Sequence, residues 1–258
     1  MVHEVARVAR IEDIARGIYL LRLHVPAIVG QGVAPGQFVH IQLPGATQHL
    51  LRRPISVMTV APETGEMDLA IQEVGAGTRL LHGLKAGDTL NVLGPLGRGF
   101  IVGGQRRVFF VGGGVGVAPI RYAANAFAPG RDAHAFLGFR SVAHAYALEG
   151  MPCPAHITTD DGSLGEHALV TDVLQNAIEE AKPELILACG PTPMLRTVQH
   201  IALRQGLPCQ LSLEEHMACG VGACLVCTCK VRVLHGMEHR RVCVDGPVFD
   251  AKEVCFDG

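Results

Sequence analysis

The sequence predicts a multi-domain protein of the β plus α/β class: an antiparallel β-barrel, a parallel-sheet α/β domain, and a small cysteine-rich C-terminal segment. Three observations predict this class. Short apolar runs separated by turns fill about the first hundred residues, strand-like and helix-like runs alternate from residue 105, and closely spaced cysteines follow residue 213. A length of 258 residues suits two domains with a small addition.

The first part of the chain, which we assign to residues 1–102, reads as β throughout. Its strand-like runs are rich in aliphatic and β-branched residues, and they lie at 3–11, 17–25, 36–43, 55–60, 67–74 and 88–94. Glycine and proline turn signals separate them. Several short strands joined by turns predict a closed or nearly closed antiparallel barrel.

The second part, which we assign to residues 103–212, alternates between the two kinds of element. Compact apolar runs predict strands at 106–113, 134–140, 153–161, 184–190 and 209–215. Apolar residues at spacings of three and four predict helices at 118–128, 167–181 and 193–205. This alternation predicts a parallel sheet with helices on both faces. Residues 213–258 form the third, short segment.

Composition excludes several classes of function. A net charge of −2 without a basic block makes nucleic acid or an anionic membrane surface an unexpected partner. No run of about 18 uncharged apolar residues is present, so no membrane span is expected. The charged N-terminus does not resemble a signal peptide, so we expect a cytoplasmic protein.

The nine cysteines point to a metal site because they are odd in number and crowd toward the C-terminal end. Cys219, Cys224 and Cys227 have the spacing C-x4-C-x2-C, and Cys243 follows fifteen residues later. This is the plant-type pattern for a [2Fe–2S] cluster, in which thiolates hold the irons. Structural zinc is the alternative, although it prefers paired C-x2-C ligands. We interpret Cys153, Cys209, Cys229 and Cys255 as small buried apolar residues.

Two loops indicate a nicotinamide nucleotide site. The first follows a strand and precedes a helix, and its candidate residues are Gly112, Gly113, Gly114 and Gly116. Backbone without Cβ atoms can approach a diphosphate, which the helix N-terminus also favours. The second follows a later strand, with candidates Cys189, Gly190 and Pro191. Both loops would open at the carboxyl ends of parallel strands, where ligands bind. An ordinary strand-to-helix turn is the alternative for the first.

Two further segments suit a phosphate-bearing ligand of the barrel. Arg53 can clamp a phosphate, Pro54 fixes the adjacent turn, and Ser56 can offer its hydroxyl to a ring nitrogen. Gly77 and Thr78 belong to a stretch that could present backbone amides to a phosphate. A solvated basic corner and an ordinary turn are the respective alternatives.

Together these motifs resemble a known family. The order of RRPIS (52–56), GAGT (75–78), GGGVGVAPI (112–120) and CGPTPML (189–195) resembles the ferredoxin reductase-like flavoproteins over nearly the whole chain. The cysteine segment with VCVDGPVF (242–249) is similar to that of the electron-transfer subunits of NAD-dependent (class 1B) dihydroorotate dehydrogenase.

The resemblance implies three cofactors and a partner. It implies FAD on Arg53, Pro54, Ile55, Ser56, Ala70, Ile71, Gln72, Gly77 and Thr78. It implies a [2Fe–2S] cluster on Cys219, Cys224, Cys227 and Cys243, with NAD as the nucleotide. The partner is an FMN-containing catalytic subunit that oxidises dihydroorotate in pyrimidine biosynthesis, and two copies of each subunit form a heterotetramer. Electrons would pass from FMN through the cluster and FAD to NAD⁺.

Some features depart from this family or leave alternatives. Ile55 stands where the wider family often has an aromatic residue that stacks on the flavin. Arg140 and Ser141 follow the second strand of the nucleotide domain and could favour NADP. A flavin and iron–sulfur subunit of a ferredoxin:NADP or sulfite-reducing system would share most motifs. A cluster-bearing regulatory protein without turnover is the alternative from another class. We assign no acid–base residue.

Overall fold

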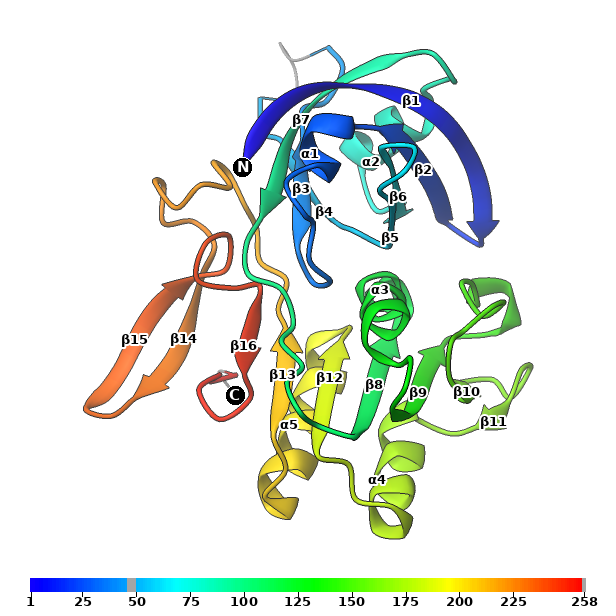
Figure 1. Cartoon of the computed structure of the whole chain (residues 1–258), viewed down its shortest axis with the longest axis vertical. Helices are drawn as coiled ribbons and strands as arrows, with labels where there is room; N and C mark the ends of the chain where they lie inside the picture. Colours follow the sequence, from blue (N-terminus) through cyan, green and yellow to red (C-terminus); the bar gives the residue numbers. More distant parts are fainter. Residues whose placement is uncertain (46–49, 257–258) are drawn as a thin grey trace.

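Figure 1 shows the computed structural model of the chain, which describes residues 1–45 and 50–256. An antiparallel sheet lies above a parallel-rich sheet in this view, and a two-stranded hairpin projects to one side. β16, near the end of the described chain, pairs with β13 of the lower sheet, so the third segment lies against the second.

The upper sheet has the strand order β4-β3-β7-β1-β2-β6-β5, and its neighbouring strands pair antiparallel. β4 at one edge also contacts β6, so the sheet curls toward closure and confirms the predicted antiparallel β domain. The elements of this part are β1 (Val2–Ala15), β2 (Ile18–His24), α1 (Pro26–Val29), β3 (Phe38–Ile41), β4 (Arg53–Ser56), β5 (Thr59–Ala61), β6 (Glu66–Gln72), α2 (Ala76–His82) and β7 (Thr89–Leu96).

The lower sheet has the order β11-β10-β9-β8-β12-β13-β16, and its pairs are parallel except for the antiparallel pair β13–β16. This confirms the predicted α/β class. Its elements are β8 (Arg107–Gly113), η1 (Gly114–Gly116), α3 (Val117–Phe127), β9 (Asp132–Phe139), η2 (Val142–His144), β10 (Ala155–Thr159), β11 (Glu166–His167), α4 (Val170–Glu180), β12 (Leu185–Cys189), α5 (Thr192–Gln205), β13 (Cys209–Ser212) and β16 (Val248–Asp250).

Several elements differ from the sequence-based expectation. The single run expected at 55–60 is two strands, because β4 pairs with β3 whereas β5 pairs with β6. Gly75 and Gly77 belong to the start of helix α2. The cysteine-rich segment contains the hairpin β14 (Thr228–Val233) and β15 (Gly236–Arg241), which the sequence did not reveal. The three domain ranges stay a prediction, since β16 joins the third segment to the second sheet.

The burial of the central strand shows that the lower sheet is covered on both faces. All five residues of β12 are buried, as expected for a central parallel strand covered on both faces. One core cluster joins α3 to residues of the upper sheet such as Leu20 and Ala70. A second cluster joins α4 and α5 to Cys227 and Cys243, and a third lies inside the upper sheet. Within residues 1–45 and 50–256, no helix is long and apolar enough to cross a membrane.

A partly buried ion pair holds β2 to β6 in the upper sheet. The Arg22 guanidinium donates to both carboxylate oxygens of Asp68 at 2.6 and 2.8 Å, and the Thr59 hydroxyl donates to the same carboxylate at 3.0 Å. Asp68 is only 8% exposed. Because Asp68→Asn weakens the charge-assisted bonds of a pair in which Arg22 is partly exposed, we expect it to lower the unfolding free energy by about 1–2 kcal/mol.

Urea unfolding of the two variants Asp68→Asn and Glu66→Gln tests this pair. Glu66 approaches Arg22 only at 3.9 Å and is partly exposed, so its loss should cost no more than about 1 kcal/mol. Equal urea midpoints for the two variants would show that the Asp68 pair stabilises the fold no more than the longer Glu66 contact does.

Candidate functional site

A cavity of about 350 Å³ opens between the upper sheet and the cysteine segment. Most of the residues predicted for FAD line it together: Arg53, Pro54, Ile55, Ser56, Ala70, Ile71, Gln72 and Thr78. They come from β4, β6 and α2, which are separated in sequence but adjacent around the curled sheet. Phe38 and Pro247 also line the cavity, so aromatic and apolar packing is available although Ile55 is aliphatic.

Gly77 does not line this cavity, but it lies next to Arg53, which does. A Cβ atom at Gly77 would lie 2.8 Å from Nε of Arg53 and 2.9 Å from the side chain of Leu43. Glycine therefore leaves room for the Arg53 guanidinium. The Arg53 NH1 group donates to the backbone oxygen of Leu51 at 2.8 Å, which fixes the direction of the side chain. The hydroxyl oxygen of Thr78 accepts hydrogen bonds from the backbone N–H groups of Val74 and Gly75, at 3.1 and 3.2 Å. These bonds stabilise the first turn of α2.

A second cavity of about 700 Å³ lies at the carboxyl ends of the parallel strands. Gly113, Gly114, Gly190 and Pro191 line it, so the structure brings the two predicted nucleotide loops together. Gln72 lines both this cavity and the first one, which makes the two spaces neighbours. This arrangement suits a dinucleotide that reaches from the strand ends to a ring held in the first cavity.

The remaining residues predicted for this site shape the loops without lining the cavity. Gly112 packs against Val117, and Gly116 packs against the Cys189 backbone. Cys189 is 1% exposed, and burial strongly raises the pKa of its thiol. The thiol of Cys189 is therefore closed to solvent and protonated at neutral pH.

The contact between Gly116 and Cys189 gives a testable expectation. A Cβ atom at Gly116 would lie 2.5 Å from the Cys189 carbonyl oxygen and 2.6 Å from the Gly190 nitrogen. Because backbone cannot yield as a flexible side chain does, Gly116→Ala should cost about 1–3 kcal/mol of stability and raise the KM for the nucleotide. Gly104→Ala, where nothing lies within 4 Å, is the matched control. An unchanged KM and melting temperature in Gly116→Ala would contradict the close approach.

The cysteine loop curls through two glycines with left-handed backbone. Gly220 has φ 70° and Gly222 has φ 83°, conformations that glycine adopts without steric cost. The backbone N–H groups of Val221 and Cys224 point at Sγ of Cys219, at 3.5 and 3.4 Å. Burial raises the pKa of Cys219, but the N–H groups of Val221, Cys224 and Ala223 outweigh it and bring the pKa to about 6. The loop thus stabilises a thiolate, which is the form that binds metal.

The four predicted ligands meet as two pairs of sulfurs. Beside the effect of burial, the Cys224 side chain lowers the pKa of Cys219 and the Cys227 side chain raises the pKa of Cys243, so the members of each pair are neighbours. Among the described residues, no group of three or more His, Cys, Asp or Glu side chains surrounds a single-ion site. A [2Fe–2S] cluster has two irons, each with two protein thiolates. The paired sulfurs and the inward N–H groups fit such a cluster.

Other contacts hold the fourth cysteine beside the loop. The Arg241 guanidinium donates to the Gly222 carbonyl at 3.3 Å and to the Asp245 carboxylate at 3.1 Å. Arg241 thereby ties the cysteine loop to the turn that carries Cys243. The Arg241 guanidinium also holds the pKa of Asp245 below its usual range.

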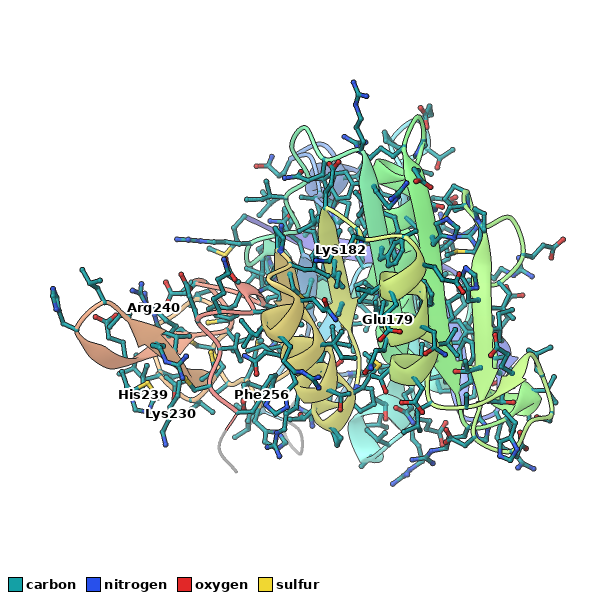
Figure 2. All side chains as sticks on the ribbon, turned by 90° about the horizontal axis from the view of Figure 1, so that it is seen from below. Glu179, Lys182, Lys230, His239, Arg240 and Phe256 are labelled. Carbon is teal, nitrogen blue, oxygen red and sulfur yellow. The ribbon has the colours of Figure 1, made fainter. Side chains whose placement is uncertain are left out.

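Cys229 and Cys255 lie apart from the loop, in a third cavity of about 740 Å³. Figure 2 shows Lys230, His239 and Phe256, which line the same cavity, between the β14–β15 hairpin and α5. Burial raises the pKa of Cys229 to about 11, so this thiol is protonated at neutral pH. Neither cysteine is placed among the paired sulfurs of the loop.

One carboxylate that sequence reasoning missed links these spaces. Glu214 lines all three cavities, and residues 213–217 lead from the first cavity directly to Cys219. Its side chain is open to the cavities, yet the surrounding protein desolvates the carboxyl group and raises its pKa. The position just after β13, at the carboxyl end of a parallel strand, is the signal that could have identified it.

Comparison with known proteins gives consistent matches. The family model for the iron-sulfur cluster binding domain of dihydroorotate dehydrogenase B matches residues 214–255, and that for the oxidoreductase FAD-binding domain matches residues 5–100. A protein of Caldanaerobacter subterraneus subsp. tengcongensis, named dihydroorotate dehydrogenase B (NAD(+)), electron transfer subunit, is 43% identical over 88% of this chain and 89% of its own length. A protein of the same name from Shouchella clausii is 38% identical over 94% of each chain.

Solved structures also share the fold. A structure described as the NADH-dependent reduced ferredoxin-NADP oxidoreductase matches with a TM-score of 0.85 and 30% identity, over 98% of this chain and 90% of that chain. Phthalate dioxygenase reductase matches with a TM-score of 0.64 over 94% of each chain, and at 16% identity it shows the fold alone.

Proposed function

The chain belongs to the family of electron-transfer subunits of NAD(+)-dependent dihydroorotate dehydrogenase B, and from this premise we propose how its residues act. It is an oxidoreductase subunit that relays electrons from a dihydroorotate-oxidising partner through a [2Fe–2S] cluster and FAD to NAD⁺, in pyrimidine biosynthesis. One observation carries this proposal: residues 213–217 line the flavin cavity and continue directly into the cysteine loop. The two redox sites are therefore neighbours.

Bound FAD and the cluster supply the conversion between one-electron and two-electron transfer. The residues of the chain bind and orient these groups. Arg53, Ser56 and Gln72 line the same cavity, where Arg53 would offer its guanidinium to the FAD diphosphate and Ser56 and Gln72 would contact the flavin. Cys219, Cys224, Cys227 and Cys243 hold the irons, and the N–H groups of the loop stabilise the thiolates. We assign no proton transfer to a side chain.

The nucleotide site brings NAD⁺ to the flavin. Gly113 and Gly114 of the first loop and the N-terminus of α3 would receive the diphosphate, with Gly190 and Pro191 lining the same cavity. Gln72, Val115 and Glu214 line both the flavin cavity and this cavity. Arg140 lines this cavity, but so does Asp160, whose carboxylate disfavours a 2′-phosphate. Ser141 bonds to His144 at 2.8 Å instead. These contacts support NAD over NADP.

The partner docks, in this proposal, on the surface around the cysteine loop. Val221, Leu225 and Val226 are 40%, 62% and 52% exposed, and Cys224 is also exposed. An exposed apolar rim beside a redox centre suits a protein partner, because burying it excludes water and brings the centres close. We propose that the partner is the FMN-containing catalytic subunit and that two copies of each form a heterotetramer. None of the nine cysteines forms a disulfide, which supports the proposed cytoplasmic location.

Reconstitution with the partner tests the proposal. The chain, expressed with a dihydroorotate-oxidising FMN subunit, should copurify as a complex in a 2:2 ratio that reduces NAD⁺ on addition of dihydroorotate.

NADH alone should bleach the flavin of the isolated chain, whereas a regulatory protein without turnover would stay oxidised. The alternative of a flavin and iron–sulfur subunit of a ferredoxin:NADP system is supported by the similarity to a ferredoxin-NADP oxidoreductase. Rapid reduction of ferredoxin by NADPH, with no dihydroorotate activity in the presence of the partner, would support that alternative.

A further inference from the structure

His40 is a fully buried histidine whose ring nitrogens have no hydrogen-bond partner among the described residues. It lies in β3 and is 0% exposed. Nδ1 and Nε2 are both buried and make no hydrogen bond of acceptable geometry, although the backbone groups of Arg52 and Cys219 lie near the ring. Either protonation state of an imidazole has at least one N–H donor. A buried donor without an acceptor is costly, and such groups in native proteins usually mark a missing ligand or a redox or catalytic role.

The position of His40 on β3 directs its ring away from the barrel core. Successive residues of a strand face opposite sides. Val39 and Ile41 belong to the core inside the upper sheet. Phe38 belongs instead to the core that contains Cys227 and Cys243, and it also lines the flavin cavity. His40 therefore shares the face of Phe38 and lies next to it on the side of the cysteine segment.

The ring of His40 touches the cysteine loop. A Cβ atom at Gly220 would lie 2.4 Å from Nδ1 of His40 and 3.0 Å from Cε1. Gly220 directly follows the predicted ligand Cys219 and has left-handed backbone. The imidazole thus occupies the space beside the loop that any other residue at position 220 would need. Among the described residues, this buried ring with unsatisfied nitrogens therefore lies against the loop that is predicted to hold the irons.

We propose that His40 is a positioning residue for the cluster, with its ring N–H donating a hydrogen bond to a sulfur at the Cys219 end once the cluster is bound. The inference rests on the proposed function, because it requires the cluster. Hydrogen bonds to cluster sulfurs are one of the factors that set the reduction potential. The donor stabilises the reduced, more negative cluster and so raises its potential relative to the flavin.

Redox titration followed by low-temperature EPR tests the proposal, with the anaerobically purified chain. His40→Leu removes both nitrogens but keeps the bulk. Its midpoint potential should fall enough to change the partition of electrons between flavin and cluster about tenfold, which is about 59 mV for a one-electron couple. His40→Asn keeps a donor near Nδ1, and His40→Gln keeps one near Nε2. At least one of them should restore the wild-type potential and EPR signal.

The control is His134→Leu, since His134 bonds to His156 at 3.1 Å in the lower sheet, away from the loop. It should leave the potential unchanged. A fully loaded His40→Leu with the wild-type potential would overturn the inference, as would Asn and Gln variants that both behave like leucine. If His40→Leu cannot hold the cluster, retention in Asn or Gln supports the inference and loss in both overturns it. A wild-type chain without a cluster would instead refute the proposed function.

Discussion

Replacing Cys224 with serine is expected to remove most of the cluster and to lower dihydroorotate-dependent reduction of NAD⁺ at least about a hundredfold. Cys224 is exposed, and its backbone N–H donates a hydrogen bond to Sγ of Cys219 at 3.4 Å. A serine hydroxyl does not ionise near neutral pH, so the iron on that side loses a thiolate ligand. Iron and sulfide analysis, together with the visible spectrum of the purified complex, measures the loss.

The flavin of Cys224→Ser should remain bound and reducible by NADH, because Cys224 does not line the flavin cavity. Cys229→Ser is the matched control, since Cys229 is only two residues beyond Cys227 but lines the third cavity. It should keep full iron content. Loss of the cluster in Cys229→Ser with retention in Cys224→Ser would reverse the assignment of the ligands.

Replacing Arg53 with methionine is expected to weaken FAD binding about 10- to 100-fold, since a charge-assisted hydrogen bond is worth about 1.5–3 kcal/mol. Arg53 lines the flavin cavity, and methionine keeps most of its apolar length. Flavin content after gel filtration and titration of the apoprotein with FAD measure the change. Gly77→Val should act in the same direction, because its side chain would displace the guanidinium.

Arg52→Met separates this role from a structural one. The Arg52 guanidinium donates to the backbone oxygens of Asn91 and His40 at 3.0 and 3.3 Å, so it joins strands and does not line the flavin cavity. We expect a lower melting temperature for Arg52→Met with FAD affinity close to that of the wild type. An equal loss of FAD affinity in both variants would remove the distinction between the two arginines.

The sequence allowed the parts with local signatures to be predicted. The spacing of the four cysteines carries its own chemistry, and the alternation of strands and helices defines the lower sheet. The hairpin β14–β15 escaped prediction because β15 is almost entirely exposed and has no apolar alternation. β16 escaped because three residues are too few to show a period.

Several residues of the candidate site could be interpreted only once the fold was known. Gly112 and Gly116 looked like ligand contacts in sequence, but they serve the packing of the loops, which depends on backbone far along the chain. Glu214 and His40 carry no motif, and only the approach of β3, β13 and the cysteine loop reveals them. The ligand roles of the FAD, NAD and cluster residues stay predictions that the variants above test.

Counting iron, sulfide and flavin in the anaerobically purified chain, together with its EPR spectrum after reduction, tests the central claim most directly. We expect two irons, two acid-labile sulfides and one FAD per chain, with an EPR signal that accounts for one unpaired electron. One zinc per chain in place of iron, or an iron-free chain with FAD alone, would contradict the account.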